Sequence, residues 1–118
     1  MKIFISQPMR DKSREDILAE RKRIEEMFKG NEFIDTFIED VPEMTGSTRL
    51  WCLGESIKRM KDANLVVSPS NAYNYAGCEI EAQVACMYGI PMCRILMYPH
   101  QEEDRYSYAN CEAVCEGR

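Results

Sequence analysis

Residues 63–91 read ANLVVSPSNAYNYAGCEIEAQVACMYGIP, and this stretch decides the fold. Its Leu65-Val66-Val67 run is almost continuously apolar, which is typical of a strand buried on both faces of a parallel sheet. A polar loop follows, and residues 78–88 then predict a helix that ends at Gly89. A further apolar run begins after Pro91. Strand, helix and strand in this order predict a βαβ unit.

The same alternation extends to both sides of this unit. It predicts further strands and helices over residues 2–6, 11–29, 32–37, 49–61 and 92–97. We therefore expect an α/β fold, a three-layer open parallel sheet of the flavodoxin or Rossmann type, with strand order about 2-1-3-4 and helices on both faces. Residues 1–98 form this domain, and the polar residues 99–118 are expected to be a C-terminal tail.

Composition limits the function. A chain of 118 residues suits one domain, and its formal charge of −5 argues against a nucleic-acid surface, although a small nucleotide stays possible. No apolar run reaches the ~18 residues of a membrane span, and the N-terminus does not resemble a signal peptide, so we expect a cytoplasmic protein. The six cysteines form no CxxC pair, and His100 is the single histidine. We expect reduced cysteines, no metal site and no cofactor.

Ligands of open α/β sheets bind beyond the carboxyl ends of the strands, near the switch point between strands one and three. Three segments meet there: residues 6–10, the loop after Asp35, and residues 68–81. Within them, Arg10 is a candidate for binding phosphate, and Asp35 for a ribose hydroxyl or a structural cap. Tyr73 and Tyr75 are candidates for stacking on a nucleobase. Trp51 is expected to pack in the core instead.

Two carboxylates begin the helix of residues 78–88. Glu79 and Glu81 both lie where the helix dipole favours an ionised carboxylate, the group that attacks a sugar anomeric carbon. They point about 200° apart, so only one can face a cleft. We expect Ile80, Val84 and Met87 to define the buried side, which does not choose between the two acids. Either acid can also merely complement the dipole.

A family resemblance favours Glu81. The pattern Gly77-Cys78-x-x-Glu81, followed by Ala85 and by Gly89-Ile90-Pro91, resembles a segment of the nucleoside 2-deoxyribosyltransferase superfamily and related nucleotide N-glycosidases. Residues 2–9 are similar to that family's first strand and its substrate loop. Residues 51–60 are similar to short bacterial and phage proteins placed beside the superfamily. The resemblance implies that Glu81 is the nucleophile, that a nucleoside or nucleotide is the ligand, and that the chain is a homodimer or higher homo-oligomer.

Ser56 stands where the family usually has an aspartate, and a serine hydroxyl is a poor general acid. Two functions are therefore open. One is a transferase or N-glycosidase that cleaves or transfers the N-glycosidic bond of a deoxynucleoside or its monophosphate; the other is a catalytically inactive nucleotide-binding module of the same fold. For both, the substrate-binding candidates are Ser6, Gln7, Pro8, Met9, Arg10, Asp35, Ser56, Ser68, Asn71, Tyr73, Gly77 and Cys78.

Overall fold

A computed structural model describes residues 1–38, 41–43, 46–70, 72, 75–98 and 105–107 of the chain. The predicted site residues Asn71 and Tyr73, and also His100, lie outside the described residues. The strands are β1 (Lys2–Ile5), β2 (Glu32–Phe33), β3 (Leu65–Pro69), β4 (Met92–Tyr98) and β5 (Arg105–Ser107). The helices are α1 (Arg14–Met27), α2 (Thr48–Arg59), the short 3₁₀ helix η1 (Met60–Asp62) and α3 (Ala76–Met87).

Within the described residues the strands form one sheet in the order β2-β1-β3-β4-β5. Strands β1 to β4 are parallel, with Ile3 of β1 beside Phe33 on one side and Leu65 on the other. This confirms the predicted α/β class and the order 2-1-3-4. Strand β5 extends the sheet by pairing antiparallel with β4, and residues 105–107 are the described part of the predicted tail.

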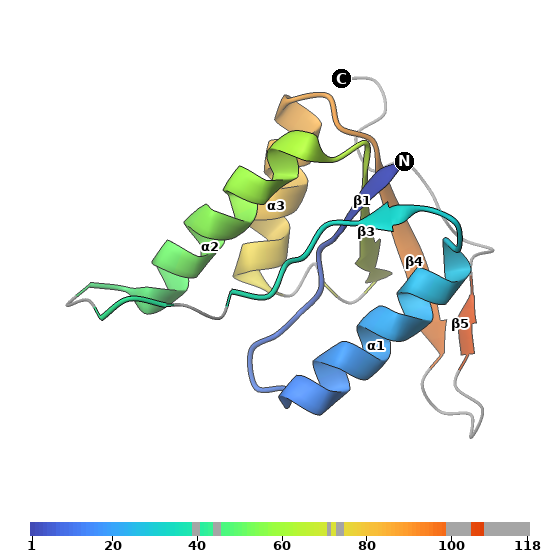
Figure 1. Cartoon of the computed structure of the whole chain (residues 1–118), viewed down its shortest axis with the longest axis horizontal. Coiled ribbons are helices and arrows are strands. Elements are labelled where there is room, and N and C mark those ends of the chain that lie inside the picture. Colours follow the sequence, from blue (N-terminus) through green and yellow to red (C-terminus); the bar gives the residue numbers. More distant parts are fainter. Residues whose placement is uncertain (39–40, 44–45, 71, 73–74, 99–104, 108–118) are drawn as a thin grey trace.

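The sheet separates two apolar cores, because successive side chains of a strand point to opposite faces. In Figure 1, α1 covers one face, while α2 and α3 lie on the other. The α1 core contains Ile3, Ile5, Ile24, Phe28, Val67, Cys93 and Ile95. The α3 core contains Phe4, Met60, Val66, Ala82, Ala85 and Met92. Helices on both faces, as predicted, therefore give three layers.

Two local expectations were wrong. The predicted strand over residues 32–37 pairs only at Glu32–Phe33, since the carbonyls that follow accept hydrogen bonds from arginine side chains instead of a strand. In α3, Ile80 and Met87 are 39% and 79% exposed, and the residues that are buried are Cys78, Glu81, Ala82 and Ala85. Small alanines let α3 lie close to the sheet, and this brings Glu81 inward with them.

In the part of the chain that the structure describes, no helix is long and apolar enough to cross a membrane. The same residues contain no group of three or more His, Cys, Asp or Glu side chains that could hold a metal ion. Cys52 and Cys78 are free thiols. Cys93 is disulfide-bonded, so the expectation of reduced cysteines fails at that position.

Candidate functional site

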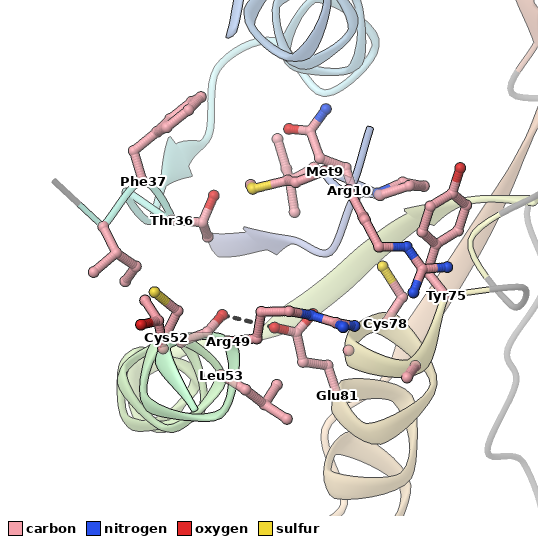
Figure 2. Close-up of a pocket in the computed structure, with 18 residues that line it drawn as sticks. Met9, Arg10, Thr36, Phe37, Arg49, Cys52, Leu53, Tyr75, Cys78 and Glu81 are labelled. Carbon is pink, nitrogen blue, oxygen red and sulfur yellow. Dashed lines mark hydrogen bonds between the residues drawn. The ribbon is translucent and has the colours of Figure 1, made fainter. Parts of the chain in front are cut away.

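A cavity of about 420 Å³ lies beyond the carboxyl end of β1, within the size range typical of small-molecule sites. Four segments line it: β1 with its following loop, the segment after β2, one side of α2, and the first turns of α3. Figure 2 shows Glu81 projecting from α3 into the space between α2 and the β1 loop. The fold therefore places a cavity at the edge of the sheet where the sequence predicted the ligand.

Glu81 is the buried carboxylate of this cavity, with 8% of its surface exposed. The hydroxyl of Ser6, directly after β1, donates to its Oε1 at 2.5 Å. The hydroxyl of Ser56, on α2, donates to its Oε2 at 2.6 Å. Three separate elements thus fix one carboxylate, and each of its oxygens keeps a lone pair for a ligand.

The surroundings of Glu81 change its acidity. Burial raises the pKa of the Glu81 carboxyl above its usual value, and the hydrogen bonds from Ser56 and Ser6 act in the opposite direction. Burial disfavours the charged form, whereas donors aimed at the carboxylate stabilise it. The result is a carboxylate of raised basicity, held in one orientation, which is the character expected of a nucleophile or proton acceptor.

Glu79, the competing acid, is placed differently. It is exposed and is absent from the lining of the cavity, whereas Glu81 lines it. The two residues lie two positions apart on one helix and so occupy nearly opposite faces. The alternative that the sequence left open is therefore answered by position: only Glu81 faces the cavity.

Cys78 also lines the cavity, one helical turn before Glu81. Burial raises the pKa of the Cys78 thiol to about 11, with the nearby Glu81 adding to the effect and a hydrogen bond with Ser6 opposing it. A thiol with this pKa stays protonated at neutral pH, and the thiolate is the reactive form. Cys78 is thus a neutral wall residue.

The other described site residues that the sequence predicted divide into three groups. Those that line the cavity are Gln7, Pro8, Met9, Arg10, Ser56 and Gly77. Asp35 and Ser68 do not line it: the Asp35 carboxylate accepts a hydrogen bond from the Phe37 amide, and Ser68 is fully buried. Ser6 contacts the site through its bond to Glu81.

Gln7 connects the site to α1. Its Nε2 donates to the Ile17 carbonyl at 3.1 Å and to the Glu20 carboxylate at 2.9 Å. These two acceptors fix which end of the amide is nitrogen. Its Oε1 is buried with no hydrogen-bond partner among the described residues. Gln7 therefore holds the β1 loop against α1, beside the cavity.

Several lining residues escaped the sequence analysis, above all those on α2. Thr48, Arg49, Cys52 and Leu53 line the cavity together with Ser56. Positions 49, 52, 53 and 56 follow the i, i+3, i+4, i+7 spacing of one helical face, so a signal was present. None of residues Thr48–Arg59 is buried, so α2 borders the cavity as a half-exposed helix.

The segment after β2 supplies the opposite wall through Thr36, Phe37 and Ile38. Two arginines hold its backbone. Arg21 of α1 donates to the Ile34 carbonyl and to the Thr36 hydroxyl, both at 2.8 Å. Arg59 of α2 donates to the carbonyls of Asp35 and Phe37. This segment is therefore held from both sides of the sheet.

Comparison with known proteins supports the fold. Neither the family models nor the curated proteins gave a match to the chain. Among solved structures, the chain is similar to a 2-deoxyribosyltransferase from the psychrotolerant bacterium Bacillus psychrosaccharolyticus, a protein described as a biocatalyst for nucleoside synthesis. The match has a TM-score of 0.60 and 16% sequence identity, and it covers 81% of this chain and 72% of that chain. The two proteins share a fold, which agrees with the resemblance seen in the sequence.

Proposed function

We propose that this protein cleaves or transfers the N-glycosidic bond of a deoxynucleoside or deoxynucleoside monophosphate, with Glu81 as the nucleophile. The observation that carries the proposal is the buried Glu81 carboxylate, held by Ser6 and Ser56 in a cavity of ligand size. The fold shared with a 2-deoxyribosyltransferase makes a nucleoside-like ligand the natural occupant.

In this mechanism a Glu81 oxygen attacks C1′ of the sugar. The new C–O bond forms as the C1′–N bond breaks, and the electron pair of that bond leaves with the base, which takes a proton from water. Water, or a second base, then attacks C1′ of the glycosyl ester and the bond from C1′ to the Glu81 oxygen breaks; the attacking group loses its proton to the hydroxide left by the first step, and the product is the free sugar or a new nucleoside. Either step returns the Glu81 carboxylate.

The serines suit this chemistry. As neutral donors, they orient the Glu81 carboxylate without the strong stabilisation that an arginine or lysine would give. A carboxylate whose pKa is raised by burial is a better nucleophile than a fully solvated one, once it is ionised. Burial also limits the access of water to the glycosyl ester once it has formed.

The test is release of free base from a panel of deoxynucleosides and their monophosphates. Wild type and Glu79→Ala should release base, whereas Glu81→Ala should lose at least about 10³-fold in rate, as expected for removal of a nucleophile. Glu79→Ala is the matched control, since it removes an exposed carboxylate from the same helix. Loss of release in Glu79→Ala with activity kept in Glu81→Ala would contradict the proposal.

The second candidate is a nucleotide-binding module without turnover, and the observation that favours it is Ser56. Its hydroxyl is engaged with Glu81, and a serine cannot protonate a departing base at neutral pH. This function predicts that nucleosides or nucleotides raise the melting temperature while no base is released. Base release by wild type that depends on Glu81 would exclude it.

A further inference from the structure

Two arginines stand at the solvent end of the Glu81 cavity. Arg10 belongs to the loop after β1, and Arg49 is the second residue of α2. Both line the cavity and both are exposed, so their guanidinium groups are accessible from its opening. In Figure 2 the two side chains extend from different walls, and both turn to the side where Glu81 and Cys78 lie.

Among the described residues, neither arginine has a close acidic partner that neutralises it. Arg10 lies over the Tyr75 ring, with 5.6 Å between its guanidinium carbon and the ring centroid. Its nearest ion pair is a 4.0 Å contact with the exposed Asp11, a type of pair that contributes little. Arg49 makes no hydrogen bond or ion pair with any described residue. Arg21 and Arg59, in contrast, are committed to backbone carbonyls.

The two arginines place positive charge at the opening of the cavity, although the chain as a whole has a formal charge of −5. The positive end of α2 adds to them, because α2 begins at Thr48 and both Thr48 and Arg49 line the cavity. Tyr75 keeps the Arg10 guanidinium over its ring by a cation–π contact. Guanidinium groups bind phosphate through paired hydrogen bonds. The opening is therefore suited to a phosphate group.

The geometry points to a phosphate subsite formed by Arg10 and Arg49, so that the substrate class of the Glu81 site is a nucleoside 5′-monophosphate rather than a nucleoside. This inference rests on the proposed function, which places the anomeric carbon at Glu81. In a nucleotide the phosphate is carried on C5′, and C5′ is bonded to C4′, across the ring oxygen from C1′. With C1′ at Glu81, the phosphate then lies toward the opening. A neutral nucleoside carries no anionic group, so neither guanidinium would have an anion to bind.

The test measures affinity by calorimetry, on a Glu81→Gln background so that turnover does not consume the ligand. The probes are the common deoxynucleosides, their 5′-monophosphates and inorganic phosphate. At least one monophosphate should bind about tenfold or more tightly than its nucleoside, as expected for charge-assisted hydrogen bonds. Arg10→Gln and Arg49→Gln should each lower that affinity ratio about tenfold. The control is Lys22→Gln, which removes one positive charge from an exposed position of α1 and should leave the ratio unchanged.

Three results would overturn the subsite: equal affinity for nucleoside and monophosphate, an affinity ratio unchanged by both arginine substitutions, or competition by inorganic phosphate as strong as that of the nucleotide. Base release, measured with Glu81 intact, separates this inference from the proposed function. Equal release from nucleosides and monophosphates, unaffected by the arginines, keeps the proposed function and overturns the subsite. Arginine-dependent monophosphate binding without base release supports the subsite and contradicts catalysis by Glu81.

Discussion

At Glu81 the proposed function and the stability of the fold make opposite demands on one side chain. Its carboxylate is buried between two neutral hydroxyls, and burial raises its pKa. Placing a charge there costs free energy of folding, which a residue chosen for stability alone would avoid. Such tension is common at functional sites.

Substituting Glu81 with Gln tests this cost. Because the pKa of Glu81 is higher in the folded than in the unfolded chain, its contribution to stability is fully present below the unfolded pKa and is lost as pH rises through the folded pKa. Glu81→Gln should therefore raise the melting temperature at pH 7, and raise it less at pH 4. Thermal unfolding at both pH values measures this, with the exposed Glu79→Gln as control. A larger stabilisation at pH 4 than at pH 7 would contradict it.

Burial raises the pKa of Glu81, and the hydrogen bond from Ser56 opposes this effect. This hydrogen bond lowers the Glu81 pKa, so Ser56→Ala should raise that pKa further. Under the proposed function Glu81 must be ionised to attack, so the acid limb of the pH–rate profile should then move to higher pH. NMR titration of the Glu81 carboxyl tests the same shift even without turnover. Ser70→Ala, which removes a hydroxyl outside the cavity lining, is the control. An unchanged titration in Ser56→Ala would show that the bond does not set the acidity.

At the scale of elements, the segment after β2 forms a cavity wall although it leaves the sheet. Arg21 is buried and donates to Ile34 and Thr36 there, and it also pairs with Glu25 at 3.0 Å. Arg21→Met keeps most of the apolar stem but leaves these acceptors unpaired. It should destabilise the protein by about 2–3 kcal/mol.

Denaturant unfolding measures this loss, with Lys22→Met on the exposed side of α1 as the matched control. The control should change stability by less than about 0.5 kcal/mol. If the two variants unfold at the same denaturant concentration, Arg21 does not hold the segment as described.

The sequence predicted the elements better than it predicted their faces. Apolar runs such as Leu65-Val66-Val67 identified the central strands, and Ser13 and Ser47 cap α1 and α2 through their hydroxyls. The buried side of α3 was mistaken because it depends on the small Ala82 and Ala85, which carry a weaker hydrophobic signal than Ile80. Size complementarity with the sheet, which a single sequence does not display, decided that face.

Only part of the candidate site could be predicted, because the rest depends on how the helices pack together. Strand ends and the family resemblance led to Gln7, Arg10 and Glu81, which do line one cavity. Arg49 was missed because its position at the opening depends on the packing of α2 against α3. The helical spacing shows which residues share a face of α2, but not that this face borders the cavity. The same packing brings Ser56 to Glu81.

At the scale of the whole molecule, α2 is the one α-helix among the described residues that has no buried side chain. None of residues Thr48–Arg59 is buried, and Leu50 is 67% exposed on this amphipathic helix. The family resemblance implies a homo-oligomer, and we propose that α2 lies at a contact between copies. Sedimentation should then show dimers or larger assemblies at micromolar concentration.

Leu50→Glu should shift this equilibrium toward monomer, since it places a charge in an apolar contact. Leu18→Glu, at a partly exposed apolar position on α1 across the sheet, should not. A wild-type protein that sediments only as monomer, or equal behaviour of the two variants, would contradict self-association through α2.

The separation of the two apolar cores by the sheet has a practical consequence for engineering. Ile24, Phe28 and Ile95 pack on the α1 side and are absent from the cavity lining. Changes that tighten the packing at these three positions can make the protein more heat-resistant while the shape of the cavity is preserved. Repacking around Ala82 and Ala85 would instead shift the helix that carries Glu81. The part of the α1 core away from the cavity is thus open to redesign, whereas the α3 core fixes the position of Glu81.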